Sequence, residues 1–269
     1  MTDPATTLPA PTRLGTDAFA GPLMVLAGGI CIGFAPIGLR LGLDDLGPQA
    51  IAFWRYIFAL PVLFGLVLLT GKRLPPKPNL FIIIAGACFA FDMALWHTAL
   101  TYTSVSNATF LVNLGNVCVG IAAWLVLRER PTAIWFAAAL ITLGGASALS
   151  LGGAAREPSA IGGDLLALGA ACFVACYMLF SNLARRPLSG LHAIFWLTVV
   201  EAVVAALLML ATGQDFLPAT LAGFAAPLGL ALLVQVAGQG LIITGLGRTP
   251  AELAGVLVLI QPVVAAAVS

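Results

Sequence analysis

Charged residues are scarce in this chain of 269 residues, because Asp, Glu, Lys and Arg together make up 9% of it. Soluble domains carry about 25% charged residues. Hydrophobic residues make up 61% of the chain, and its mean hydropathy is +1.06. The composition therefore excludes an ordinary soluble domain and predicts a polytopic membrane protein. The formal net charge of +1 also offers no strongly basic surface to a nucleic acid partner.

Residues that commonly catalyse reactions or bind metals are also few. The two histidines, His97 and His192, lie far apart in sequence, and neither an H-E-x-x-H nor a G-x-S-x-G motif occurs. We therefore expect no enzyme, no catalytic residue, no cofactor and no metal. No nucleotide-binding signature occurs either, which argues against ATP as the direct energy source. Intramembrane catalysis is kept as an alternative hypothesis.

The cysteines do not form the pattern of a secreted disulfide framework, because all five lie within apolar runs. A metal pair at Cys172 and Cys176, four residues apart on one helix face, would lack a third ligand. We expect the cysteines to pack as small apolar side chains. They are Cys31, Cys88, Cys118, Cys172 and Cys176.

Long apolar runs dominate the chain after a polar start. About 20 apolar residues suffice for a helix to cross a bilayer, and nine runs of about that length occur. These runs are residues 21–42, 48–70, 80–101, 105–127, 132–152, 164–184, 190–212, 223–246 and 250–269. Residues 1–20 lack the features of a removable signal peptide.

The apolar runs contain an internal repeat. Phe53-Trp54 recurs as Phe195-Trp196, 142 residues later. A second ordered set recurs 146 residues later. Its members are Leu95, Thr98, Leu100, Thr103, Ala108, Leu111, Val112 and Val117, which match Leu241, Thr244, Leu246, Thr249, Ala254, Leu257, Val258 and Val263. Two related membrane bundles in one chain are a common architecture of secondary transporters.

Basic residues between the spans predict the orientation. With the N-terminus in the cytoplasm, nine Lys and Arg residues face inward and two face outward, as the positive-inside rule requires. The inward set is Arg13, Lys72, Arg73, Lys77, Arg128, Arg130, Arg185, Arg186 and Arg248, and the outward set is Arg40 and Arg156. Residues 1–20 are then a cytoplasmic tail.

The spans divide into two repeats of opposite orientation. Residues 21–152 hold spans one to five, and residues 163–269 hold spans six to nine. Because five spans precede the second repeat, it begins on the other side of the membrane, so the repeats are inverted. We interpret the second repeat as an incomplete copy of the first, in which a tenth span is missing. We therefore predict an all-α polytopic membrane protein with two inverted five-helix repeats, of which nine spans are present.

Several segments, taken in order, resemble one known family. They are Ala52-Phe53-Trp54-Arg55-Tyr56, Ala94-Leu95-Trp96-His97-Thr98, Leu127-Arg128-Glu129-Arg130-Pro131, Gly162-Gly163-Asp164-Leu165 and Pro250-Ala251-Glu252-Leu253-Ala254 before Gln261-Pro262. This set resembles the drug/metabolite transporter superfamily, specifically the EamA-type bacterial permeases. The chain departs from that family at Asn116, where span four usually carries proline, and in the missing tenth span.

The resemblance implies ten helices in inverted repeats, a place in the bacterial cytoplasmic (inner) membrane, and transport of amino acids or other small metabolites. We expect a secondary transporter, an exporter or permease, that works by alternating access with possible proton coupling. The alternatives are a multidrug or nucleotide-sugar carrier and a non-transporting membrane scaffold. The expected partners are a small-molecule substrate, the lipid bilayer and, as options, a proton and a second copy in a homodimer. The substrate, direction, coupling ion and oligomeric state stay open, as does the activity of a chain without span ten.

Three ionisable residues lie deep within spans. Because a charge is costly inside the membrane, such residues are candidate functional residues by default. Arg55, Asp92 and Glu201 fall in one layer near the middle of the membrane, if each residue advances a helix by about 1.5 Å. They are candidates for proton coupling or for binding a zwitterion. The alternative for Arg55 and Glu201 is a structural ion pair between two helices.

Asp92 lies on a helix face suited to substrate binding. Phe89 and Trp96 share its face at i−3 and i+4. The opposite face carries a stripe of small residues suited to close helix packing. The stripe is Gly86, Ala90 and Ala94. We predict that Asp92, Phe89 and Trp96 bind a cationic group through charge pairing and cation–π attraction.

Amide side chains complete the candidate substrate-binding set. Gln235 and Gln239 share a face at i, i+4, Asn113 lies in span four, and Gln261 precedes a proline in span nine. Amides can recognise a carboxylate or carbonyl group of a substrate. They can equally join helices to each other, at about 0.6 kcal/mol per contact.

Overall fold

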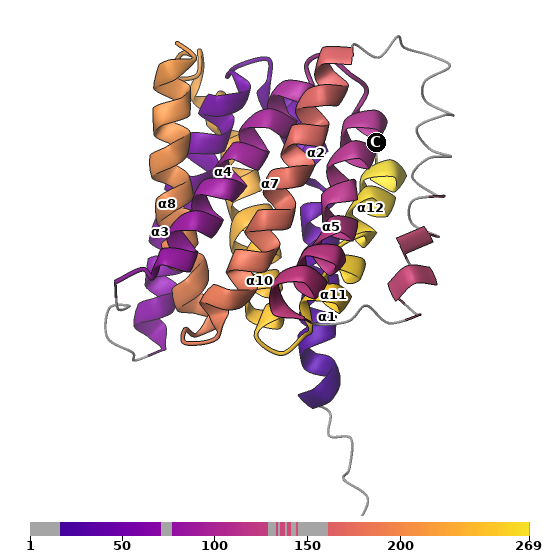
Figure 1. The fold of residues 1–269 in the computed structure, drawn as a ribbon. Coiled ribbons are helices and arrows are strands. Elements are labelled where there is room, and N and C mark those ends of the chain that lie inside the picture. Colours follow the sequence, from indigo (N-terminus) through magenta and orange to yellow (C-terminus); the bar gives the residue numbers. More distant parts are fainter. Residues whose placement is uncertain are drawn as a thin grey trace, which may run out of the picture.

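The computed structural model describes residues 17–70, 77–128, 133, 135–137, 139–140, 144 and 161–268. The elements within these ranges are helices (Figure 1). Six helices are long and apolar enough to cross a membrane, at Phe19–Gly42, Pro48–Leu69, Leu80–Ala99, Ile161–Arg185, Gly190–Ala211 and Leu221–Leu246. The protein is therefore an all-α polytopic membrane protein, as the sequence predicted.

The first repeat supplies five of the labelled helices. They are α1 (Asp17–Ile32), α2 (Ala35–Gly42), α3 (Pro48–Leu69), α4 (Leu80–Ala99) and α5 (Val105–Leu127). Helices α1 and α2 together form the first predicted span. The fifth predicted span, residues 132–152, lies almost wholly outside the described residues.

The second repeat begins with two long helices and continues with shorter ones. They are α7 (Ile161–Arg185), α8 (Gly190–Ala211), η1 (Leu221–Phe224), α9 (Ala225–Gly229), η2 (Leu230–Gln239), α10 (Gly240–Leu246), α11 (Ala251–Leu257) and α12 (Ile260–Val268). The segment from η1 to α10 is the predicted eighth span. Its middle part, η2, is a π-helix. This form is rare in proteins, and where it occurs it is often found at functional sites.

Local sequence signals set several helix ends. The Asn79, Ser104 and Ser189 side chains accept hydrogen bonds from the backbone N–H groups of Ile82, Asn107 and His192. Such caps satisfy the free N–H groups of a first helical turn. Helix α3 instead begins with Pro48, whose fixed φ suits the first helical position.

Helices of the two repeats pack against one another in a single bundle (Figure 1). Helix α3 packs on α8, α4 packs on α7 and α8, and α1 packs on η2 and α10. The repeated Phe-Trp pair has the same geometry in both copies. The ring centroids of Phe53 and Trp54 are 5.5 Å apart at 72°, and those of Phe195 and Trp196 are 5.6 Å apart at 71°.

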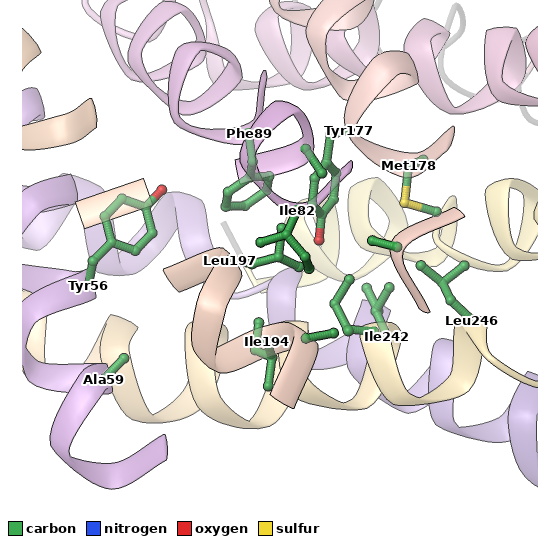
Figure 2. Packing of buried hydrophobic residues seen from close by; sticks show 14 of the residues in the cluster. Tyr56, Ala59, Ile82, Phe89, Tyr177, Met178, Ile194, Leu197, Ile242 and Leu246 are labelled. Carbon is green, nitrogen blue, oxygen red and sulfur yellow. The ribbon is translucent and has the colours of Figure 1, made fainter. Parts of the chain in front are cut away.

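Aromatic and aliphatic side chains fill the centre of the bundle (Figure 2). Phe89 of α4 and Tyr177 of α7 lie side by side there, with ring centroids 4.6 Å apart. Small residues allow the close approach of α4 and α8. A Cβ added at Gly86 would lie 2.8 Å from the Val200 Cβ atom. Gly86 thus occupies the packing face that the small-residue stripe predicted.

Two helix breaks, one in each repeat, line the same cavity of the bundle. Helices α1 and α2 are separated at Gly33 and Phe34, and α11 and α12 at Val258 and Leu259. A proline follows each break, Pro36 in α2 and Pro262 in α12, and proline cannot donate the next backbone hydrogen bond. The first break packs against the start of α12, which follows the second break, since a Cβ on Gly33 would lie 3.1 Å from the Gln261 carbonyl oxygen. Irregular backbone is tolerated at membrane depth where protein buries it or where it lines a cavity.

Candidate functional site

A cavity of about 80 Å³ lies between the helix breaks and the aromatic centre of the bundle. Its walls come from α1, α2, α3, α4, α5, α7, η2, α10 and α12 and from Val258 in the break between α11 and α12. Both repeats therefore contribute to it. The polar and charged side chains that line it are Arg55, Asp92, Trp96, Thr109, Asn113, Tyr177, Gln239 and Gln261.

Asp92 is the most unusual lining residue. Its side chain is 0% exposed, and neither carboxylate oxygen has a hydrogen-bond partner among the described residues. Phe89 and Trp96 line the cavity beside it. The Trp96 Nε1–H group is also buried without an acceptor in the described part of the chain. Buried polar groups are normally paired, so this end of the cavity presents groups that a ligand can satisfy.

Tyr177 lines the cavity next to Phe89, with ring centroids 4.6 Å apart. Its hydroxyl donates a hydrogen bond of 3.2 Å to Gln239 Oε1, which places the aromatic ring and the amide on the same cavity. Asn113 is held by a hydrogen bond of 2.7 Å from its Nδ2 atom to the Thr109 carbonyl oxygen, within α5. These bonds fix the direction of two polar lining residues.

Arg55 reaches the cavity from α3, and the side-chain amide of Gln235 binds its guanidinium group. Its Nε and Nη2 atoms donate to Gln235 Oε1 at 3.1 and 2.7 Å. The Gln235 Nε2 atom donates in turn to Glu201 Oε2 at 2.7 Å and to Thr198 Oγ1 at 2.9 Å. All four side chains are at most 1% exposed. Gln235 therefore joins α3 to α8 through η2.

The two charged residues considered as a structural ion pair thus meet through Gln235. The Gln235 amide accepts from Arg55 Nη2 at 2.7 Å and donates to Glu201 Oε2 at 2.7 Å. A hydrogen-bonded network that includes Arg55 and Glu201 thus joins three helices, α3, η2 and α8.

The structure brings most of the predicted site residues to one cavity. These are Asp92, Phe89, Trp96, Asn113, Gln239, Gln261 and Arg55. Gln235 and Glu201 do not belong to its lining. The two glutamines predicted to share a helix face therefore have different surroundings. Gln235 points toward Arg55, whereas Gln239 lies at the cavity.

Several lining residues were not among the sequence candidates. Tyr177, Met93 and Met178 line the cavity, and Tyr177 was detectable in principle as a lone hydroxyl-bearing aromatic within an apolar span. His97, in the last turn of α4, lies outside the cavity lining, and its Nδ1 atom is 3.1 Å from the carbonyl oxygen of Pro48 at the start of α3. Within the described ranges, no three His, Cys, Asp or Glu side chains converge as metal ligands.

A family model described as the EamA-like transporter family matches residues 19–151 and 161–269. The chain belongs to this family. The resemblance found in the sequence segments is thereby confirmed, and the two matched ranges correspond to two copies of the EamA repeat.

Curated relatives are similar at moderate identity. The Escherichia coli (strain K12) protein named uncharacterized inner membrane transporter YhbE is 29% identical over 136 residues, which cover 48% of this chain and 42% of YhbE. The Bacillus subtilis (strain 168) protein named uncharacterized transporter YwfM is 26% identical over 187 residues, covering 68% of this chain and 62% of YwfM. The aligned regions thus span less than two thirds of either relative.

A solved crystal structure shares the fold. It aligns with a TM-score of 0.75 at 19% identity and covers 94% of this chain and 88% of that one. Together with the six apolar helices of the described residues, the family match identifies this chain as an integral membrane protein with two EamA repeats.

Proposed function

We propose that the protein is a secondary transporter of small amine-bearing metabolites, amino acids among them, and that it works by alternating access. The observation that carries this proposal is Asp92, a fully buried carboxylate without a hydrogen-bond partner among the described residues, at a cavity shared by two EamA repeats.

The chemistry of Asp92 favours a cationic ligand group. Burying an unpaired carboxylate in a membrane protein is costly, so a partner that enters the cavity gains a strong charge-assisted interaction. Phe89 and Trp96 flank the carboxylate, and their rings add cation–π attraction for an ammonium group. Oxygen acceptors and aromatic faces together recognise an amine better than they recognise an anion.

Asp92 also provides a simple route to proton coupling. A carboxyl group that binds either a proton or a substrate ammonium group cannot bind both at once. Each substrate that enters the site would displace a proton, and each proton would displace a substrate. Alternation of the site between the two sides of the membrane then exchanges one for the other.

The lining argues against phosphate-bearing substrates. Anionic groups of nucleotide sugars would require several basic side chains, whereas Arg55 is the one Lys or Arg among the described lining residues. The cavity volume of about 80 Å³ also favours small metabolites over bulky drugs in this conformation. Both observations support amine-bearing metabolites over the multidrug and nucleotide-sugar alternatives.

Counterflow in liposomes tests the proposal. The full-length protein is reconstituted into vesicles loaded with unlabelled amino acids, singly and in mixtures, and entry of labelled substrate is followed. We expect counterflow for at least one amine-bearing compound and none in empty vesicles. Protein that is folded and reconstituted but gives no counterflow with any of them would favour the membrane scaffold instead. Counterflow of sugar phosphates without amines would favour the carrier alternative.

A further inference from the structure

The cavity holds two oppositely charged side chains that do not touch. Arg55 and Asp92 both line it, and no hydrogen bond or ion pair joins them in the described part of the chain. Opposite charges attract strongly where water is excluded. Some other contact must therefore hold the guanidinium group away from the carboxylate.

Gln235 supplies that contact. Its Oε1 atom accepts two hydrogen bonds from Arg55, at 3.1 Å from Nε and 2.7 Å from Nη2. The amide cannot turn over without a penalty, because its Nε2 atom donates to Glu201 and Thr198 at 2.7 and 2.9 Å. Reversing it would place two donors against the guanidinium group and the amide oxygen against a carboxylate. The network therefore fixes both the place and the orientation of Arg55.

One edge of the guanidinium group makes only a weak further contact within the described residues. Gln235 uses the edge formed by Nε and Nη2, whereas Nη1 contacts the Met93 sulfur atom at 3.7 Å. Thioether sulfur is a weak acceptor. The edge formed by Nη1 and Nη2 is the planar fork that binds a carboxylate through two parallel hydrogen bonds.

We propose that Gln235 is a positioning residue that keeps Arg55 apart from Asp92, so that the cavity presents two separate poles to its substrate. Asp92 takes the ammonium group, and the edge of Arg55 formed by Nη1 and Nη2 takes a carboxylate of the same molecule. The cavity then selects zwitterions over simple amines. This inference rests on the proposed function and adds a requirement for an acidic group next to the amine.

Glu201 completes the arrangement without entering the cavity. It accepts a hydrogen bond from Gln235 and is fully buried, and it does not belong to the cavity lining. Its hydrogen bond of 2.7 Å with Gln235 holds the amide in the orientation that turns Oε1 toward Arg55. The Arg55 side chain is thus held when no substrate is bound, rather than being drawn to Asp92.

Matched pairs of an amino acid and its decarboxylated amine test the two poles. Binding is measured by competition on the reconstituted full-length protein. The pairs are leucine and isoamylamine, phenylalanine and phenethylamine, and tryptophan and tryptamine. We expect the wild type to prefer the acid of a recognised pair by about tenfold or more, as expected for charge-assisted hydrogen bonds. In Gln235→Met, Arg55 can turn to Asp92, and this preference should fall to about twofold or less.

Two further variants separate positioning from general packing. The paired exchange Gln235→Glu with Glu201→Gln keeps an acceptor for Arg55 and should retain the preference, even if Gln235→Met does not fold. Gln49→Met is the matched control, since Gln49 is a buried glutamine of the same helix as Arg55 that bonds to the Ala94 carbonyl oxygen at 3.1 Å. It should also retain the preference.

The outcomes distinguish this inference from the proposed function. A wild type that binds acids and amines equally, a Gln235→Met variant that keeps the preference, or a paired exchange that loses it would each overturn the two-pole site. The amine transporter would stand in those cases. Counterflow that is absent for every amine-bearing compound would instead remove the proposed function itself.

Discussion

Phe89 of α4 and Gln235 of η2, which belong to different repeats, both contact the Arg55 guanidinium group. The Phe89 ring centroid is 5.8 Å from Arg55 Cζ, and Gln235 Oε1 is 2.7 Å from Arg55 Nη2. One repeat thus offers an aromatic face and the other an amide. Both repeats therefore contribute to holding Arg55 in place.

Replacing Asp92 with Asn should separate coupling from exchange. The amide keeps the shape of the side chain and loses its ability to carry a proton, so folding and expression should be retained. We expect loss of accumulation driven by a pH gradient, measured as uptake into proteoliposomes, while exchange of labelled for unlabelled substrate continues at reduced affinity. Loss of both activities would mean that Asp92 binds substrate alone. Normal rate, affinity and pH dependence would make Asp92 a structural contact.

Replacing Trp96 with Ala should weaken substrate binding without preventing assembly. Trp96 is 6% exposed, lines the cavity next to Asp92 and carries an Nε1–H group without an acceptor in the described structure. Loss of a cation–π partner costs about 0.5–2 kcal/mol, which predicts a rise in the apparent KM of about 2- to 30-fold with a smaller change in kcat. Trp54→Ala is a control, because Trp54 lies outside the cavity lining and bonds to the Phe216 carbonyl oxygen. An unchanged KM in Trp96→Ala would place the ammonium group elsewhere.

Gly86 should tolerate no large side chain. Its added Cβ would lie 2.8 Å from Val200 Cβ and 3.2 Å from the Leu197 carbonyl oxygen, so Gly86→Leu must push α4 away from α8. Overpacking of this kind costs about 1–3 kcal/mol, and we expect a lower Tm in detergent. Gly65 in α3 is the matched control, because nothing lies within 4 Å of its added Cβ. Equal Tm values for Gly86→Leu and Gly65→Leu would contradict the α4–α8 contact.

The predicted orientation can be tested by labelling of single cysteines. The five native cysteines are first replaced with alanine, and one cysteine is then introduced at Lys77 or at Asp215. Lys77 precedes α4 and Asp215 follows α8. With the N-terminus in the cytoplasm, a membrane-impermeant maleimide added to intact cells should label position 215, and position 77 only after permeabilisation. The reverse pattern would invert the whole topology.

The sequence was sufficient for the architecture and for one face of the site. Scarce charge and long apolar runs require membrane helices, and the ordered repeats at 142 and 146 residues indicate two copies of one bundle. Helix periodicity also places Asp92, Phe89 and Trp96 on one face, because residues three and four apart are neighbours on any α-helix. These conclusions depend on local geometry, which the order of residues determines directly.

Tertiary structure alone decided which polar groups meet. Arg55 and Gln235 are 180 residues apart in the chain, and no periodicity within α3 or η2 indicates that one helix lies against the other. The same limit explains why the sequence did not indicate that Gln235 bonds to both Arg55 and Glu201. A sequence determines the face on which a side chain lies. The packing of several helices determines its partner, because that partner depends on distances between elements that the chain order does not contain.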